Sequence, residues 1–324
     1  MKPILILLLL SILCSNSFAQ TIEYSLPPNL EKTISPKDYK TIVDQSVGLV
    51  SKKYKIESVK DATITMDGHQ MFNLDNLISK CLAETDHAKW QSVINDHFNA
   101  LFVSMEQKGN IDLHNYEAVK PYLSIRIYPT ITVNERGGTD KLITQNDLEG
   151  TQTLLMLDLP QAFTTVSKAD FENWHKTAEE AFKAASENIA KQPVNKASKT
   201  FKIDNTDVEF NFIENEDYAA SYALNLEANA PEMVGEWGSV MAFPNKGLVT
   251  VCKVSKAHPV EFVKFIQRIK PLIDQSYSQH AYPVSTNFFW YYQGKFTTIP
   301  INVDAQGILH VTAPIGLGTL MAGK

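Results

Sequence analysis

The sequence lacks an excess of positive charge. Its 324 residues include 30 Lys and Arg against 36 Asp and Glu, which gives a net charge of −6 at pH 7. Proteins that bind nucleic acids through the phosphates usually carry a basic excess, so this balance argues against a nucleic-acid partner. Cysteine is also scarce. The chain has three, which are too few for a protein held together by several disulfides.

The motifs of common metal, nucleotide and hydrolase sites are missing too. The eight histidines and three cysteines form no His-x-x-x-His or Cys-x-x-Cys pair, the spacings typical of zinc ligands. No Gly-x-Ser-x-Gly turn surrounds a nucleophilic serine, and no Gly-x-Gly-x-x-Gly or Walker-type loop could hold a phosphate. We therefore expect neither a metal nor a cofactor.

The sequence has one long apolar run, and it lies at the N-terminus. Residues 4–14 are apolar apart from one serine, and residues 17–19 then place small side chains at positions −3 and −1 of a cleavage site. A bilayer takes about 20 helical residues, so the run is too short to span it and is typical of a secretory signal peptide. We expect cleavage after Ala19 and a periplasmic or secreted product without a transmembrane segment. The alternative is a lipoprotein with Cys14 lipidated, which the bulky Leu13 disfavours.

The rest of the chain has the composition of a folded protein, since 44% of all residues are hydrophobic. Residues 20–84 predict a helix-rich N-terminal extension. Ser35 and Pro36 are typical of a helix start, and apolar residues follow at helical spacing up to residue 54. A second, short helix is predicted over residues 74–82.

Residues 85–324 predict one α+β domain. Two hairpins are expected at the C-terminal end, over residues 239–254 and 286–303, with a helix between them that begins at Pro259. The order strand–strand–helix–strand–strand indicates an antiparallel sheet with helices packed on one face.

Two further elements are predicted in the first half of this domain. Residues 122–128 alternate between apolar and polar side chains, which indicates a half-buried strand with Ser124 and Arg126 on its polar face. Ser167 begins a capped helix whose apolar stripe runs to Ile189.

Four features of the sequence resemble, in their order, those of a known family: residues 122–129, the strand 154–157 with the capped helix that ends in residues 185–189, residues 215–221 and residues 240–248. In this order they resemble an uncharacterised bacterial family, a domain of unknown function best known from cytosolic proteins of Gram-positive bacteria. The resemblance is distant and covers roughly residues 85–303. It implies one connected domain but no chemistry, because the family has no established activity, substrate or catalytic residue. The export signal and the segment 20–84 depart from the family's pattern.

Three residues are candidates for ligand binding. Trp290 and Tyr292 belong to an aromatic run, residues 288–292, and would share one face of a strand where a sugar ring or a peptide could stack. The alternative is a central strand covered on both faces, as continuous apolar strands commonly are. Arg126 could hold an anionic group through two parallel hydrogen bonds, and the alternative is an arginine that faces water.

An acidic cluster lies between residues 204 and 217. Two converging carboxyls could serve a glycoside hydrolase, and several carboxylate oxygens could bind calcium. The alternative is the solvated face of an edge strand, because two of the acids alternate with apolar residues. The candidates are Asp207, Glu209, Glu214 and Glu216, with Asp204 and Asp217 at the ends of the cluster.

Two cysteines remain after signal cleavage, Cys81 and Cys252. An oxidising compartment would permit a disulfide between them. The alternative is a pair of buried thiols that behave as small apolar residues.

Two functional hypotheses follow from the sequence. The first is an exported, non-catalytic protein that binds a protein or a glycan of the bacterial envelope. The alternative is an envelope hydrolase that uses paired carboxylates in the 204–217 region.

Overall fold

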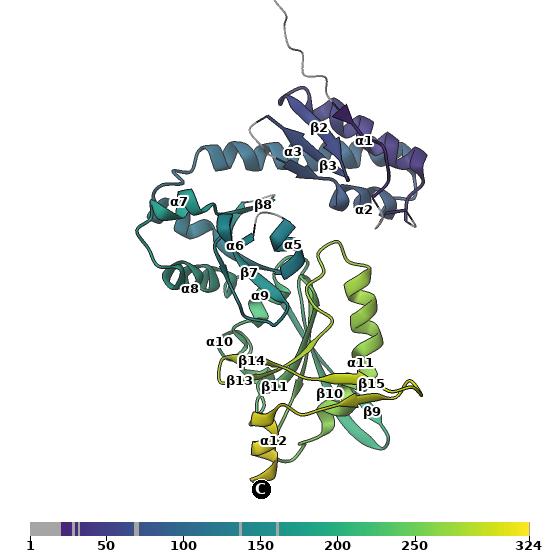
Figure 1. Ribbon diagram of the computed structural model, residues 1–324, viewed down its shortest axis with the longest axis vertical. Helices are drawn as coiled ribbons and strands as arrows, with labels where there is room; N and C mark the ends of the chain where they lie inside the picture. Colours follow the sequence, from purple (N-terminus) through teal and green to yellow (C-terminus); the bar gives the residue numbers. More distant parts are fainter. Residues whose placement is uncertain are drawn as a thin grey trace, which may run out of the picture. The chain divides into compact units, whose positions relative to one another are not determined.

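The computed structural model of the chain describes residues 21–27, 30–31, 33–67, 71–135, 138–159 and 162–323 (Figure 1). The predicted signal peptide, with its cleavage after Ala19, lies outside the described residues. The chain divides between Ala100 and Leu101 into two compact units.

The first unit contains a four-stranded sheet and two complete helices. The strand order is β1-β2-β3-β4, with β1 parallel to β2 and the other pairs antiparallel. The predicted helix-rich extension therefore also holds a sheet. The sequence indicates only β3, through the weak alternation of residues 62–66, because β1 and β4 have two and three residues, too few to show a period. The elements are β1 (Thr21–Ile22), α1 (Pro36–Val50), β2 (Ile56–Lys60), β3 (Thr63–Met66), β4 (Met71–Asn73) and α2 (Asp75–Ala83).

Helix α1 begins where the sequence predicts. The Ser35 hydroxyl accepts a hydrogen bond from the Asp38 backbone N–H at 3.1 Å, and Pro36 occupies the first turn, where no N–H partner is needed. Tyr39 is fully buried, and its hydroxyl accepts from the Ala62 N–H at 3.2 Å. This contact fixes α1 to the turn between β2 and β3.

A six-stranded antiparallel sheet forms the centre of the second unit (Figure 1). Both predicted hairpins belong to it, and the order β14-β13-β11-β12-β10-β9 confirms the α+β class. The second predicted hairpin is shorter than expected, because the chain leaves the sheet after Thr298. The strands are β9 (Asn195–Ile203), β10 (Thr206–Glu214), β11 (Ser239–Asn245), β12 (Leu248–Lys253), β13 (Phe288–Tyr292) and β14 (Lys295–Thr298).

Both faces of this sheet are covered. Helix α11 (Glu261–Ser278) packs Phe262, Phe265 and Ile266 against one face. The short helix α9 (Ala219–Ala223) packs against the other face and also against a second sheet. The sequence predicted helices on one face of the sheet, and the structure has helices on both. The second face is covered because β11 and β13 carry apolar side chains on both sides.

The second sheet carries the strand that was predicted to be half-buried. Strand β5 (Leu123–Pro129) pairs with β7 (Thr151–Leu159), whose other edge pairs with β6 (Thr144–Gln145) and β8 (Ala162–Thr165). One face of β5 belongs to the main core with α8 (Ala178–Ile189) and α9. The opposite face is also buried, so the expectation that its polar residues face water is wrong.

The predicted helix over residues 167–189 is two helices. Helix α7 (Lys168–Glu172) is capped by Ser167, and His175 then adopts a φ of +50° that no right-handed helix contains. Thr177 starts α8 in a capping box with Glu180. Each helix therefore has its own cap within the predicted span.

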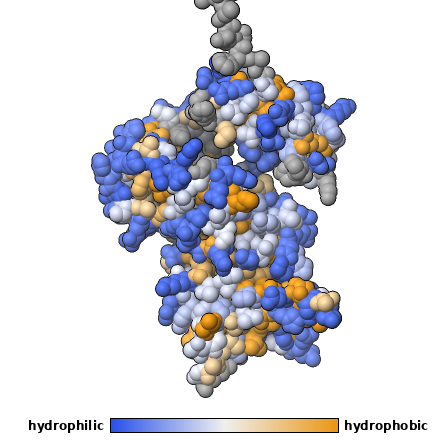
Figure 2. All heavy atoms as spheres, viewed as in Figure 1, coloured by the Kyte–Doolittle hydropathy of each residue, from blue (hydrophilic) through white to orange (hydrophobic). Residues whose placement is uncertain are grey.

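One 20-residue helix, several short helices and a two-stranded C-terminal sheet complete the described part of the chain. Val303, Ile308 and Ile315 are exposed near the C-terminus, where Figure 2 shows apolar residues over β15 and α12. None of the helices among the described residues has both the length and the apolar composition needed to cross a bilayer. The remaining elements are η1 (His87–Lys89), α3 (Trp90–Gly109), α4 (Tyr116–Val119), η2 (Lys120–Tyr122), α5 (Thr130–Glu135), α6 (Gly138–Lys141), α10 (Leu226–Asn229), η3 (Pro231–Met233), β15 (Ile301–Val303), β16 (Leu309–Val311) and α12 (Ile315–Ala322).

Candidate functional site

Five polar side chains from distant parts of the sequence meet in the second unit, on the face of β5 opposite the main core. We call them the polar cluster. Arg126 comes from β5 and Asp158 from the end of β7; Asp217 and Tyr218 precede α9, and Lys246 lies in the turn between β11 and β12. The cluster therefore joins both sheets of this unit.

Arg126 is the most deeply buried charge of the cluster, with an exposed fraction of only 6%. Its Nη2 donates to Asp217 Oδ1 at 2.6 Å, and its guanidinium carbon lies 3.6 Å from the centre of the Phe163 ring. Its Nε has no hydrogen-bond partner within the described part of the chain. The Tyr282 ring lies 5.6 Å from the same carbon, so one carboxylate and two aromatic rings surround the guanidinium.

Asp217 accepts hydrogen bonds from two cations at one oxygen. Lys246 Nζ lies 2.7 Å from the same Oδ1 that Arg126 contacts. Burial acts to raise the pKa of Asp217, but the hydrogen bonds and charges of Lys246 and Arg126 outweigh it and lower the pKa. Burial, together with the nearby charge of Arg126, lowers the pKa of Lys246. Asp217 is therefore an ionised carboxylate at neutral pH, held by two cations.

The loop before α9 positions Asp217 and Tyr218 through one side chain. Asn215 Oδ1 accepts from the backbone N–H of Asp217 at 2.8 Å and of Tyr218 at 3.0 Å. This turn geometry is one that Asn readily forms with the backbone two residues on. The Ser221 hydroxyl of α9 then donates to the Ile125 carbonyl of β5 at 2.8 Å, which fixes the loop beside Arg126.

Asp158 and Tyr218 form the other half of the polar cluster. The Tyr218 hydroxyl donates to Asp158 Oδ2 at 2.7 Å. Burial raises the pKa of Asp158, although the Tyr218 hydrogen bond and the charge of Arg126 act in the opposite direction. Burial and the Asp158 carboxylate raise the pKa of Tyr218, so that its hydroxyl keeps its proton. The cluster contains two cations and two carboxyls, and their formal charges balance.

A cavity of about 250 Å³ adjoins Asp158 and Tyr218, and we call it the Asp158 cavity. Ser124 lines it from β5; its side chain is buried, and its hydroxyl has no hydrogen-bond partner among the described residues. Asn188 of α8 also lines the cavity and donates to the Leu123 carbonyl at 3.0 Å, which ties α8 to the start of β5. Tyr122 and Gln192 supply an aromatic ring and a further amide.

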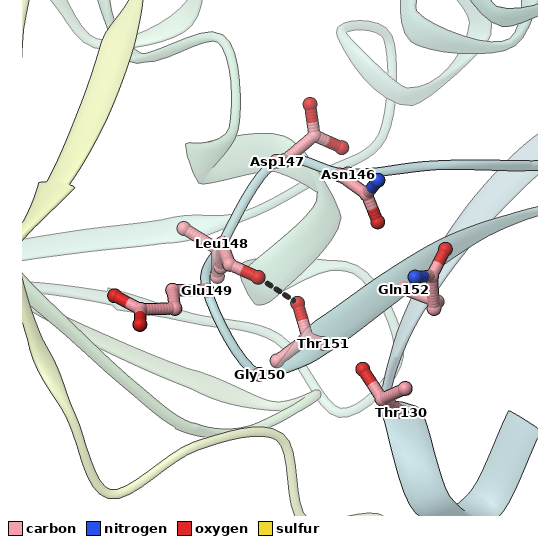
Figure 3. Close-up of a pocket in the computed structure, with 8 residues that line it drawn as sticks. All are labelled: Thr130, Asn146, Asp147, Leu148, Glu149, Gly150, Thr151 and Gln152. Atoms are coloured by element: carbon pink, nitrogen blue, oxygen red, sulfur yellow. Dashed lines mark hydrogen bonds between the residues drawn. The ribbon is translucent and has the colours of Figure 1, made fainter.

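A second cavity, of about 310 Å³, lies at the loop between β6 and β7, and we call it the Asp147 cavity (Figure 3). Its carboxylates, on Asp147 and Glu149, point in different directions in Figure 3. The hydroxyl of Thr151 donates to the Leu148 carbonyl at 2.9 Å, which closes the loop on itself. No aromatic or basic side chain lines this cavity, so it offers a ligand fewer kinds of contact than the Asp158 cavity does.

Of the three predicted binding residues, Arg126 lies in the polar cluster and the other two do not. Trp290 is 6% exposed, and its indole N–H donates to the Trp237 carbonyl at 2.7 Å. Tyr292 stacks on the Trp290 ring with the ring centres 5.1 Å apart. Residues on both faces of β13 belong to core clusters, which matches the alternative of a central strand covered on both sides.

The predicted acidic cluster does not converge on one point. Glu209 pairs with Lys253 at 3.1 Å across the sheet, whereas Asp207, Glu214 and Glu216 are exposed. Asp217 is the one acid of the region that enters the polar cluster. No group of three or more His, Cys, Asp or Glu side chains within the described residues is arranged to hold a metal ion.

The structure shows both Cys81 and Cys252 as free, buried thiols. Cys81 lies on α2 of the first unit, and burial raises its pKa to about 11. Cys252 lies in β12 of the second unit, and burial with the nearby Glu261 and Glu209 carboxylates raises its pKa as well. Neither thiol has the electropositive, exposed setting of a reactive cysteine.

Sequence reasoning missed Asp158, Tyr218 and Lys246 as site residues. Tyr218 and Lys246 lie in stretches that the sequence analysis singled out, residues 215–221 and 240–248, but no motif there marks them as site residues. Comparison with protein-family models, curated proteins and solved structures found no match to this chain. A functional proposal therefore rests on the geometry of the polar cluster and the Asp158 cavity.

Proposed function

We propose that the protein is exported and binds a component of the bacterial envelope without catalysis, and that the Asp158 cavity is its ligand site. The observation that carries the proposal is the cavity lining. A buried hydroxyl without a partner (Ser124), a carboxyl (Asp158) and two tyrosines border one small cavity. Ligand sites are typically concave, with apolar or aromatic walls and a few polar groups that fix orientation.

The arrangement of charges supports binding over hydrolysis. A glycoside hydrolase needs two carboxyls with room for a sugar and water between them. Asp217 instead has one oxygen occupied by Arg126 and Lys246, which leaves Asp158 as the one carboxyl that lines the cavity. A glycan is favoured over a protein partner, because a cavity of about 250 Å³ is small and takes a compact group.

The hydrolase alternative keeps one observation in its favour. Asp158 has a raised pKa and Asp217 a lowered one, and both carboxyls belong to the polar cluster. Two carboxyls whose pKa values are pushed apart are typical of a general acid and its ionised partner. If the protein hydrolyses a glycan, Asp158 is the general acid and Asp217 is the ionised carboxylate. Asp217→Asn should then abolish product formation.

A sedimentation assay tests the proposed function. Purified protein is mixed with insoluble envelope glycan and centrifuged, and the supernatant is assayed for newly formed sugar reducing ends. We expect the protein in the pellet and no new reducing ends. Recovery of the protein in the supernatant at the level of an unrelated acidic control protein would count against binding. Formation of new reducing ends that Asp217→Asn prevents would establish the hydrolase instead.

Export is tested separately. The protein should appear in the periplasmic or culture fraction with Gln20 as its N-terminal residue, as measured by mass spectrometry of the intact chain. Recovery of the full chain from the cytoplasm, beginning at Met1, would contradict export.

A further inference from the structure

We propose that the Asp158 cavity takes a neutral, hydroxyl-rich ring, a single sugar unit, in preference to a charged ligand. This inference rests on the proposed binding function and names the class of ligand at the same site. Three features of the described residues carry it: the unused hydrogen-bonding groups, the tyrosines at the wall, and the balance of charge behind the wall.

The hydrogen-bonding groups match a ligand that both donates and accepts. Tyr218 occupies Asp158 Oδ2 at 2.7 Å, and no contact to Oδ1 is present among the described residues, so this oxygen can accept from a ligand hydroxyl. The Ser124 hydroxyl is buried without a partner and can both donate and accept. Sugar hydroxyls have the same dual capacity: one can donate to Asp158 Oδ1, and another can bond the Ser124 hydroxyl once that side chain, which solvent does not reach in this structure, rotates towards the cavity.

The aromatic lining suits a ring with an apolar face. Tyr122 is 37% exposed, and Tyr218 is half-buried; both border the cavity. Tyrosine offers an apolar ring face with a polar end, and this combination fits a molecule whose ring carbons and hydroxyls point in different directions. The volume of about 250 Å³ lies below the roughly 300–1,000 Å³ of pockets for drug-sized ligands, which indicates a smaller occupant.

The charges near the cavity disfavour ions of either sign. A cation would meet Asp158 but also the field of Arg126 and Lys246, which lie behind it in the polar cluster. An anion would meet the two cations but also Asp158 at the wall and Asp217. Because the four formal charges balance, a neutral ligand loses nothing to repulsion, whereas an ion of either sign meets a like charge.

The test is a calorimetric titration of the exported chain with four small probes: glucose, N-acetylglucosamine, choline and inorganic phosphate. We expect binding of at least one sugar and no heat above dilution from choline or phosphate. Asp158→Asn should weaken the sugar about tenfold, because the amide keeps an acceptor for Tyr218 but cannot provide a charged acceptor to the ligand. Ser124→Ala should weaken it as well.

The matched control is Asp147→Asn, the same substitution at the wall of the Asp147 cavity, which should leave sugar affinity unchanged. Far-ultraviolet circular dichroism of each variant shows that it is folded. Binding of choline or phosphate in place of the sugars, abolished by Asp158→Asn, would overturn the ligand class and leave the site as a binding site. Absence of heat with every probe would overturn the sugar inference, while the sedimentation assay decides on its own whether the protein binds the envelope. An equal loss of sugar affinity in Asp158→Asn and Asp147→Asn would also overturn the sugar inference.

Discussion

At the scale of single residues, Arg126 shows what a strand pattern can and cannot predict. Alternation along residues 122–128 placed Arg126 and Ser124 on one face of β5, and the structure confirms that shared face. The pattern could not predict what covers that face, because the covering residues Phe163 and Asp217 come from segments far along the chain. A buried arginine and an exposed one look the same in a single sequence.

Loss of Arg126 should destabilise the fold. Arg126→Ala removes a buried guanidinium, but the Asp217 carboxylate is 38% exposed and keeps Lys246, so we expect a cost of about 1–2 kcal/mol of unfolding free energy. Lys176→Ala is the control, because Lys176 pairs with an exposed glutamate, Glu180, one helical turn away and its loss should be barely measurable. Urea unfolding of both variants measures the difference. Equal midpoints for the two variants would show that the Arg126 pair contributes little.

His97 provides a pH-dependent prediction. Burial and the nearby Lys80 lower its pKa from 6.5 to about 4, so the folded chain keeps the ring neutral. Between these two pKa values the unfolded chain binds the proton more tightly than the folded chain does. The free energy of unfolding therefore falls as the pH drops from 6.5 towards 4, and above pH 6.5 His97 causes no loss of stability. The expected loss is on the order of 2 kcal/mol, and His97→Gln should abolish it. An NMR titration of the His97 ring checks the pKa directly, and a value near 6.5 would contradict burial of the neutral ring.

At the scale of elements, helices with caps were predictable and strand partners were not. Ser35 marks the start of α1 because its hydroxyl bonds locally, to a residue three positions on. The pairing of β11 with β13 joins residues about fifty positions apart, and nothing local specifies it. The contacts of the polar cluster join residues between 29 and 91 positions apart, which explains why the candidate site was only partly predicted.

The close approach of β11 and β13 depends on Gly238. This residue has a φ of +80°, and an added Cβ would lie 2.1 Å from the Tyr291 carbonyl oxygen. Gly238→Ala should therefore destabilise the protein by about 3 kcal/mol or more, from backbone strain and overpacking together. Gly294 has a similar φ of +73° with open space around it, so Gly294→Ala should cost only about 1–2 kcal/mol. Thermal unfolding of the two variants separates the backbone strain, which both share, from the steric crowding, which only Gly238→Ala has. Equal losses of stability in the two variants would contradict crowding at Gly238.

At the scale of the whole molecule, the chain consists of two units, and each holds one of the two cysteines that remain after the predicted signal cleavage. The apolar content predicted a folded protein, and the order of predicted strands and helix near the C-terminus predicted the α+β class, which the structure bears out. The sheet of the first unit escaped prediction because its strands are short. The covering of the central sheet on both faces escaped because it depends on α9, a helix of five residues with little periodicity.

The two thiols should both be free in the isolated protein. Unfolding the protein without reductant should expose two reactive thiols per chain, because Cys81 and Cys252 are unpaired. In the folded protein both should react slowly, since burial raises both pKa values. Quantitative labelling with a thiol reagent gives both results. Fewer than two thiols after unfolding, restored by a reductant, would show a disulfide.

The central claim is that the Asp158 cavity binds an envelope glycan without cleaving it. The most direct measurement is an NMR titration of the isotopically labelled protein with soluble glycan fragments, which reports binding site and product in one tube. We expect the largest backbone shifts at Ser124, Asp158 and Tyr218, and no change in the number of anomeric signals from the fragments. Shifts centred on Asp147 or elsewhere, or new anomeric signals from cleaved sugar, would contradict it.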